Sequence, residues 1–570
     1  MNVSNRKILD KAFTALAYSS LAAMALAVVL FLAPIIWNGA GAFAFTATVE
    51  HEKFLGEVVG DDINESEKTR IAEADAAREP LYKMMSDYEN PASAKALERG
   101  LDEAFAKSAA GMPAESGEIF AALKLGGAAR AKAIRAASEK FWKPYVSALE
   151  REVADASAAG TSFALAEILA RQEGEIADAV RGEIAELGKI RKLTFSEKSA
   201  LRRNAGEIPS EKIAEALAVL EENNRAYETL SDGIAELLGP RDSAARERAK
   251  LLRRKYGQTR LDNARAVLEN SVNTITVRGR DASGAEFLKR VSSAEYFRGT
   301  PVEKIVAYVD GNFDAMLRPH FALYLGFLFD DPYDSNIFGG IFPMILGTFY
   351  LTFGSMLIAA PLGIIAAIYF AEYARNGRVA SVLRMCVGTL AGVPSIVFGL
   401  FGLAFLINTV KVSESKSVLA GAITLALLIL PTIIRSCEEA LKAVPNSYRE
   451  AALGLGAGKW RAICTVILPA ALPSMLTGII ISMGRAAGET APIIFTAATS
   501  TGAALALSEV FTQATPALPW NIYNICSEHE MAERVAHVQY GMVLTLISIV
   551  LLLNGVAIWV RARMRSKMKS

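Results

Sequence analysis

Residues that build disulfide frameworks and metal centres are scarce in this 570-residue chain. It has four cysteines and four histidines, and Cys386, Cys437, Cys464 and Cys526 show no CxxC spacing. A disulfide scaffold is therefore excluded, and neither a cysteine-ligated metal nor a zinc site is expected. The HExxH and GxSxG patterns are also missing from the sequence. We therefore predict no enzyme and no cofactor.

Charged side chains are missing from long stretches, although the net charge of +1 looks ordinary. Residues 12–43 have none, and the 235 residues 336–570 have only 27, with a net charge of +7. The 292 residues 44–335 hold 90 charged side chains and a net charge of −8. This partition predicts a soluble region inserted into a membrane protein. Neither part has the dense basic face that nucleic-acid binding requires, so no nucleic-acid partner is expected.

Apolar runs long enough to cross a bilayer occur six times, since a membrane helix needs about 20 apolar residues. The runs are Ala12–Phe43, Ile337–Ala371, Met385–Val410, Ser417–Ile434, Ala470 to about Leu507, and Tyr540–Val560. A signal peptide is the competing interpretation of the first run, because Ala42-Phe43-Ala44 resembles a cleavage site. The run is longer than the ~7–15 apolar residues of a signal peptide, which favours a retained anchor.

Lysine and arginine near the ends of these runs predict the orientation, because positively charged loops stay in the cytoplasm. Basic residues gather at 6–11, 375–384, 435–461 and 561–569, and six spans place all four groups on one side. We therefore predict cytoplasmic residues 1–11, a membrane helix at 12–43, an extracytoplasmic, periplasmic region at 44–335 and a second membrane region at 336–570. Both termini would be cytoplasmic.

The predicted periplasmic region reads as mainly helical. Residues 157–193 and 210–238 place apolar side chains at helical spacing between charges, whereas residues 273–296 alternate in the manner of strands. No catalytic group stands out in it. We interpret this region as a docking or spacing domain, with ligand sensing as the alternative.

The loop at 435–470 is not a simple connector between two spans. Pro445 breaks a first helical segment, and Asn446 or Ser447 can cap a second one that begins near Tyr448. Glycines at 454, 456 and 458 end this short helix, which predicts a projecting knob that can enter a groove on a partner.

A phosphate-binding P-loop is excluded at the Gly458-Lys459 pair. The motif needs glycine at position 453 and serine or threonine at 460, where the chain has Leu453 and Trp460. ATP hydrolysis, if it drives the function, therefore belongs to a separate subunit.

Two charges interrupt the fifth apolar run, in the segment GRAAGETAP at 484–492. A charge at bilayer depth costs at least about 2.5–3.5 kcal/mol, so it is kept for a pairing or a pathway. Arg485 and Glu489 are four residues apart and share a helix face. The arginine fork suits a tetrahedral oxyanion, and Glu489 can orient it or accept a hydrogen bond from a protonated anion. A purely structural ion pair is the alternative.

The loop resembles the EAA loop of ABC-importer membrane subunits. The matching residues are Glu450-Ala451-Ala452, Gly456 and, after nine residues, Val466-x-Leu468-Pro469. In that family the loop is the coupling helix that seats in the ATPase. The resemblance therefore implies ATPase coupling by Glu450, Ala451, Ala452, Gly454, Gly456, Leu468 and Pro469.

Residues 336–570 further resemble the permeases of the phosphate-specific Pst transporters, PstA subunits more than PstC subunits. The resemblance rests on GRAAGETAP, on 391–399 (AGVPSIVFG) and on 430–445 (LPTIIRSCEEALKAVP). It implies an all-α polytopic membrane protein with six transmembrane helices of ABC type I importer architecture, here with a large helical extracytoplasmic insertion between helices 1 and 2. The substrate pathway would include Arg485, Glu489, Thr490, Arg435, Pro394 and Ser395.

The resemblance also implies the partners: a PstC-like permease forming a heterodimer, a PstB-like ATPase dimer, the periplasmic phosphate-binding protein PstS, inorganic phosphate and the lipid bilayer of the bacterial inner membrane. It assigns no role to residues 44–335. Importers of sulfate, molybdate or phosphonate and a membrane-anchored sensor are the alternatives, and Glu489 beside Arg485 favours an anion that still carries a proton. A proton-coupled secondary transporter would not need an EAA loop.

Overall fold

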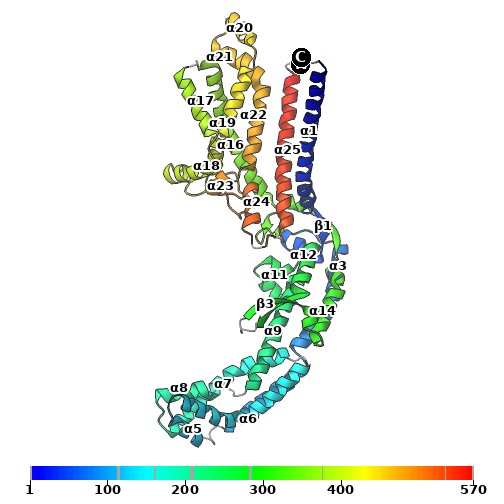
Figure 1. Cartoon of the computed structure of the whole chain (residues 1–570), viewed down its shortest axis with the longest axis vertical. Coiled ribbons are helices and arrows are strands. Elements are labelled where there is room, and N and C mark those ends of the chain that lie inside the picture. Colours follow the sequence, from blue (N-terminus) through cyan, green and yellow to red (C-terminus); the bar gives the residue numbers. More distant parts are fainter. Residues whose placement is uncertain are drawn as a thin grey trace. The chain divides into compact units, whose positions relative to one another are not determined.

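The computed structural model describes residues 3–111, 116–159, 162–205, 211–280, 286–374, 377–529, 531–532 and 534–567, which are mainly helical (Figure 1). The chain divides into two compact units. One combines Met1–Phe45 with Phe321–Ser570, and the other is Thr46–His320. The charge partition placed the corresponding boundaries at residues 44 and 335.

The first unit contains the apolar runs. Its helices are α1 (Val3–Ala40), α16 (Phe342–Ile368) with its continuation η5 (Tyr369–Tyr373), α17 (Arg378–Leu390), α18 (Ser395–Phe401) with η6 (Gly402–Thr409), α19 (Val418–Lys442), α20 (Asn446–Gly454), α21 (Lys459–Ala462) with η7 (Ile463–Ile467), α22 (Leu468–Gly488), α23 (Ala491–Thr496), η8 (Glu509–Phe511), α24 (Leu518–Ser527) and α25 (Ala536–Lys567). Short segments η4 (Leu325–Leu328), β5 (Pro332–Tyr333) and β6 (Phe338–Gly339) precede α16.

Five of the described helices are long and apolar enough to cross a membrane, and a bent pair gives a sixth. The bent pair is Arg378–Leu390 with Ser395–Thr409, whose axes differ by 100°. Pro394 stands at the bend as the residue before α18. Because proline has no N–H to donate and disfavours the helical conformation at the residue before it, it favours a break at this position.

The fifth apolar run differs from its prediction as one span from 470 to about 507. The helix begins earlier, at Lys459, and ends at Gly488, after which α23 starts at Ala491. Pro492 stands in the first turn of α23, where its missing N–H costs no helical hydrogen bond. Hydropathy alone therefore overestimated the length of this helix.

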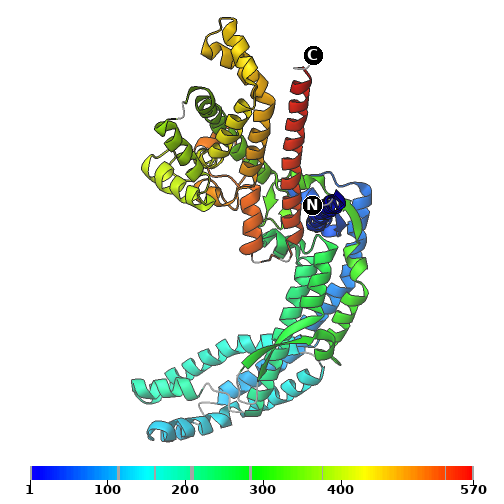
Figure 2. The same ribbon diagram turned by 45° about the horizontal axis from the view of Figure 1, so that its top comes forward.

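Small residues let α16, α19 and α22 pack closely. A Cβ added at Gly363 of α16 would lie 2.5 Å from Ile433 Cγ2, and one at Gly478 of α22 would lie 2.1 Å from Ser436 Cβ, both on α19. Such contacts are the usual way in which membrane helices approach each other. Figure 2 shows these helices from a second direction, with α20 projecting beyond the end of α22 as in Figure 1.

Helices α1 and α25 pack along each other, as Figure 1 shows. A Cβ at Gly39 of α1 would lie 2.8 Å from Tyr540 O and from Leu544 Cβ of α25. From Phe13 on, most apolar side chains of α1 are exposed, among them Phe31 and Trp37. Such a surface suits lipid.

The second unit is helical with one long hairpin. Its elements are α2 (Val49–Phe54), η1 (Leu55–Val59), α3 (Glu65–Glu89), α4 (Ala94–Gly111), α5 (Ser116–Leu123), α6 (Gly127–Ala159), α7 (Ser162–Ile190), α8 (Phe195–Asn204), α9 (Glu211–Leu238), α10 (Ser243–Arg248), α11 (Leu252–Tyr256), α12 (Leu261–Val267), η3 (Leu268–Val272), β2 (Thr274–Arg280), β3 (Glu286–Ser292), α13 (Ser293–Tyr296), α14 (Pro301–Gly311) and α15 (Phe313–Leu317). Strands β1 (Ala44–Ala47) and β4 (His320–Leu323) pair where the chain passes between the units.

Two hydrophobic clusters support this unit. One gathers α3, α9, η3 and α14 around residues such as Leu81 and Leu230. The other gathers α4 to α8 around Trp142, whose Nε1 donates to Ala205 O over 2.9 Å. The antiparallel pairing of β2 with β3 confirms that residues 273–296 contain strands.

Candidate functional site

The segment predicted to line a pathway lies at a break between two helices. Glu489 follows the last residue of α22 with an extended backbone (φ −76°, ψ 122°), and Thr490 precedes α23. The Thr490 hydroxyl donates to Pro519 O over 3.5 Å. In a membrane, irregular backbone is tolerated where it is buried in protein or lines a cavity. Charge and a broken helix therefore coincide at this position.

Arg485 and Glu489 form the predicted pair, with Arg485 Nε 3.1 Å from Glu489 Oε1. The arginine side chain is 45% exposed and the glutamate 20% exposed. Within the described part of the chain, Arg485 has no other side-chain partner. Its two terminal amino groups are therefore available to a planar or tetrahedral anion, while Glu489 fixes the orientation of the fork.

The bend at Pro394 lies in the same region of the unit. Helix α18 packs on α23, since a Cβ at Gly399 would lie 2.9 Å from Ala491 O and 3.0 Å from Pro492 Cα. Ser395 starts α18, one turn before Gly399. The two interrupted helices are thus neighbours, which is the arrangement that transporters use to build sites for ions near the middle of the membrane.

Arg435 lies apart from the Arg485 pair. A Cβ added at Gly388 of α17 would lie only 2.7 Å from Arg435 Nη2. The guanidinium of Arg435 therefore packs against α17 at this glycine. No carboxylate pairs with it among the residues described. Because Ser436 contacts Gly478, seven residues before Arg485 on α22, the two arginines differ in depth by about 10 Å along the helices.

The predicted coupling loop forms a short helix, α20, closed by a glycine turn. The helix starts at Asn446, slightly earlier than predicted, because Pro445 occupies the capping position. Gly456 has φ +80°, Gly456 N–H donates to Leu453 O over 3.0 Å and Ala457 N–H donates to Ala452 O over 3.1 Å. This pair of bonds is a Schellman motif, which requires a left-handed residue at the glycine position.

Most side chains of this loop face outward. Glu450 and Ala451 are exposed, whereas Ala452 is buried beneath them. Tyr448, Leu453, Leu455 and Trp460 add exposed apolar surface, with Leu455 90% exposed. Leu468 packs against the core of the unit, and Pro469 takes the first turn of α22, where proline is tolerated.

Ion pairs at the ends of the helices escaped the sequence interpretation. Arg384 Nε lies 3.2 Å from Glu438 Oε1, and Lys442 Nζ lies 2.6 Å from the same oxygen. Arg449 pairs with Glu372 in the same way, at 2.8 Å. Residues 336–570 contain few carboxylates. A carboxylate close to a basic loop could therefore have been predicted to form an ion pair.

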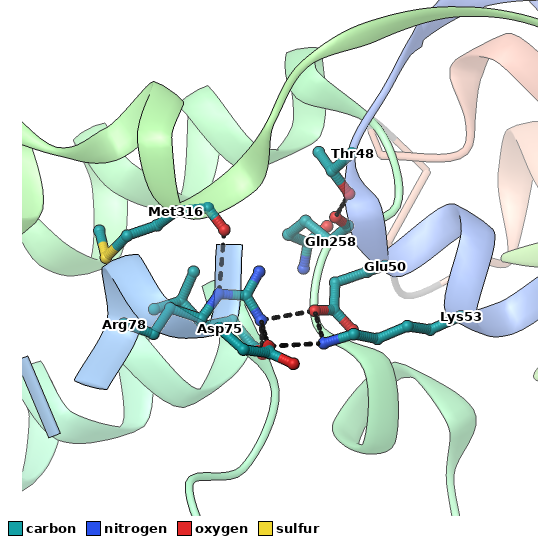
Figure 3. Close-up of polar contacts among 8 residues, drawn as sticks. Thr48, Glu50, Lys53, Asp75, Arg78, Gln258 and Met316 are labelled. Carbon is teal, nitrogen blue, oxygen red and sulfur yellow. Dashed lines mark hydrogen bonds and ion pairs between the residues drawn. The ribbon is translucent and has the colours of Figure 1, made fainter. Parts of the chain in front are cut away.

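The second unit contains a buried charge cluster that reasoning from the sequence also missed, formed by Glu50, Lys53, Asp75 and Arg78 (Figure 3). Arg78 and Glu50 are 1% and 0% exposed, and Arg78 Nη1 lies 2.6 Å from Glu50 Oε1. Lys53 Nζ joins Glu50 and Asp75 at 3.2 and 3.0 Å. Arg78 Nε donates to Met316 O over 2.9 Å, which fastens α3 to the end of α15.

The neighbouring residues extend this network. Glu52 is paired with Arg70 and lies 3.2 Å from His320 Nε2. Burial, with further contributions from the nearby charges of His320 and Arg260, lowers the pKa of His51 from 6.5 to about 4. Among the residues that the structure describes, no group of three or more His, Cys, Asp or Glu could hold a metal ion. These contacts have a structural role in joining the two ends of the unit.

Comparison with known proteins places the C-terminal part of the chain in a group of transporters. Residues 359–570 match the family described as binding-protein-dependent transport system inner membrane component. The phosphate transport system permease protein PstA 1 of Mycobacterium tuberculosis (strain CDC 1551 / Oshkosh) is 37% identical over 225 residues, which cover 39% of this chain and 71% of that protein.

Two further relatives match shorter stretches. PstA of Yersinia pestis is 45% identical over 28% of this chain and 52% of its own length. The probable ABC transporter permease protein YqgI of Bacillus subtilis (strain 168) is 39% identical over 29% of this chain and 55% of its own length. The chain thus spans about half the length of these two relatives. The family match begins beyond the unit Thr46–His320.

Proposed function

Because this chain belongs to the binding-protein-dependent transport system inner membrane component family, we propose that it is the permease subunit of an ABC importer for inorganic phosphate. The family consists of ABC transporter permeases, which are multi-pass membrane channel subunits and not enzymes. The similarity to PstA proteins supports phosphate as the cargo. In this proposal a separate ATPase supplies the energy, and a periplasmic protein delivers the anion.

The main structural support for this proposal is the Arg485–Glu489 pair at the helix break. Within the described residues Arg485 is bound through Nε alone, so the N–H groups of Nη1 and Nη2 remain as donors for an oxyanion. Glu489 has a second carboxylate oxygen that can accept a hydrogen bond from hydrogenphosphate, whereas sulfate at neutral pH has no proton to donate. Arg435, about 10 Å deeper along the packed helices, offers a second cation for an anion that moves inward.

The exposed coupling loop supports the ATPase as partner. Tyr448, Leu453 and Leu455 present apolar surface on a short helix, the form that helix-in-groove recognition uses. ATP-driven changes in the partner would move α20 and so shift the equilibrium between two conformations of the permease, because a partner that binds one conformation more tightly shifts the population toward it.

We propose that the unit Thr46–His320 is periplasmic and contacts the binding protein or the second permease. Its acidic composition and soluble helical core support an aqueous location. Deleting residues 49–318, which keeps β1, β4 and the buried Phe327 of the membrane unit, is expected to weaken the affinity of the complex for the binding protein. Unchanged affinity and uptake would refute this role without touching the proposal for phosphate transport.

Reconstitution tests the transport function directly. The chain is co-purified with its PstC-like partner and ATPase, placed in vesicles with the binding protein, and supplied with radiolabelled phosphate. Uptake that depends on ATP and is not suppressed by excess sulfate or molybdate supports phosphate specificity. Uptake of sulfate or molybdate in preference to phosphate would assign the chain to another oxyanion.

A further inference from the structure

Glu372 lies at the end of α16, in the π-helical turn η5, and binds a residue of the coupling helix. Arg449 donates to Glu372 Oε1 from Nε over 3.0 Å and from Nη2 over 2.8 Å. The glutamate side chain is 7% exposed and the arginine 20% exposed. Because both donors and the acceptor are charged and largely shielded from water, this contact is stronger than a surface ion pair.

The same guanidinium also binds the end of α19. Nη2 donates to Leu441 O over 2.8 Å, and Nη1 donates to Val444 O over 2.7 Å. The Leu441 carbonyl also accepts from Val444 N–H over 3.3 Å, so Arg449 adds a second donor there and also binds the Val444 carbonyl just beyond the helix. One side chain of α20 thereby joins the ends of two membrane helices, α16 and α19.

Lys459 fastens the other side of the loop to the same residue. Its Nζ donates to the backbone oxygen of Glu372 over 2.5 Å and lies 4.6 Å from the centre of the Tyr373 ring. The loop from Arg449 to Lys459 is therefore held at both ends by the turn around Glu372, through a carboxylate on one side and a carbonyl on the other.

We infer that Glu372 is a positioning residue that makes α20 move as one body with the ends of α16 and α19. This inference rests on the proposed function, in which α20 contacts the ATPase. A partner that binds the exposed apolar side chains of the loop can move α20. The ends of α16 and α19 move with α20 only if they are rigidly connected to it. The Glu372–Arg449 contact supplies that connection.

A substrate-independent measurement tests the contact first. Hydrogen exchange of the α20 amides is compared in the full chain in nanodiscs for wild type, Glu372→Gln and Glu439→Gln. Glu439 is the matched control, because it is an exposed carboxylate on α19 with no side-chain partner among the described residues. We expect exchange in α20 to accelerate about tenfold in Glu372→Gln, as loss of a charge-assisted hydrogen bond predicts, and to stay unchanged in the control.

Two outcomes of that experiment would overturn the inference. Equal exchange in Glu372→Gln and wild type would show that the carboxylate does not hold α20. Faster exchange throughout α16, α19 and α22 would show that Glu372 maintains the fold in general instead of positioning the loop.

Transport by the reconstituted complex then tests coupling. We expect Glu372→Gln and Arg449→Lys to retain ATP hydrolysis but to lose about fivefold or more of the phosphate transported per ATP, the usual lower size of an allosteric coupling. The double variant should be no worse than either single one, because the two side chains act as a unit. Transport per ATP equal to that of Glu439→Gln would contradict the inference. Absence of ATP-driven phosphate uptake in wild type would instead contradict the proposed function, and the exchange result would still decide on Glu372.

Discussion

Arg485 donates from Nε to Oε1 of Glu489 over 3.1 Å, across the point where α22 ends. The pair joins the last turn of a membrane helix to the extended residue that follows it. Its position beside the bent α17–α18 pair gives a charged group at a break in the membrane helices.

Replacing Arg485 should strongly reduce phosphate transport without loss of assembly. Arg485→Gln removes the charge, and Arg485→Lys keeps the charge but loses the planar fork, so both are expected to lower uptake by about tenfold or more. Arg378→Gln is the control, because Arg378 is exposed at the start of α17 with no side-chain partner in the described structure. Radiolabelled phosphate uptake measures the effect, and full uptake by Arg485→Gln would remove this residue from the pathway.

Gly456→Ala should uncouple ATP hydrolysis from uptake. The left-handed backbone at φ +80° costs an alanine about 1–2 kcal/mol, so the turn after α20 is expected to shift. Gly458→Ala is the matched control, because its φ of −64° suits any residue and no atom lies within 4 Å of an added Cβ. ATP hydrolysis and uptake are measured together, and tight coupling in Gly456→Ala would argue against the role of this turn.

Breaking the buried charge cluster should destabilise the unit Thr46–His320. Arg78→Met leaves Glu50 buried with a reduced set of partners, and removal of one member of a buried pair typically costs about 3–5 kcal/mol. Lys68→Met removes an exposed pair with Glu65 and should cost less than about 1 kcal/mol. Hydrogen exchange of the α3 amides reports the free energy of opening. Equal protection in both variants would show that the buried pair adds no stability.

His51 should make the stability of this unit depend on pH. Its pKa is about 4 in the folded state and 6.5 in the unfolded state, so the unfolded state binds more protons between these values. Stability is therefore full above pH 6.5 and falls by about 3 kcal/mol as the pH drops toward 4. The pH dependence of α2 hydrogen exchange measures this loss, and the slope should flatten in His51→Phe. An identical slope in that variant would assign the dependence to other groups.

Periodic and local features were predictable from the sequence, whereas contacts between distant segments were not. The coupling loop could be located because Pro445 and the following glycines act on their own neighbours. Glu372 and Arg449 are 77 residues apart, and nothing in their spacing shows that α16 and α20 meet. The break after Gly488 was missed because hydropathy averages over Pro492, although this proline was the local signal.

The buried charge cluster shows the same limit in the second unit. Within this cluster the Asp75 side chain stays 55% exposed, whereas those of Glu50 and Arg78 are almost completely buried. Arg78 is buried where α3 meets the end of α15, more than 200 residues later in the chain, and Glu50 is buried against Arg78. Composition reports how many charges a region has, but their burial depends on tertiary packing.

Uptake into vesicles that contain the complete complex shows whether this chain conducts phosphate past Arg485 under the control of an ATPase. Phosphate should accumulate only when ATP and the binding protein are supplied, and Arg485→Gln should lose this accumulation while Arg378→Gln keeps it. Equal accumulation by the two variants would exclude Arg485 from the phosphate pathway, and ATP-driven uptake of sulfate with none of phosphate would exclude phosphate as the cargo.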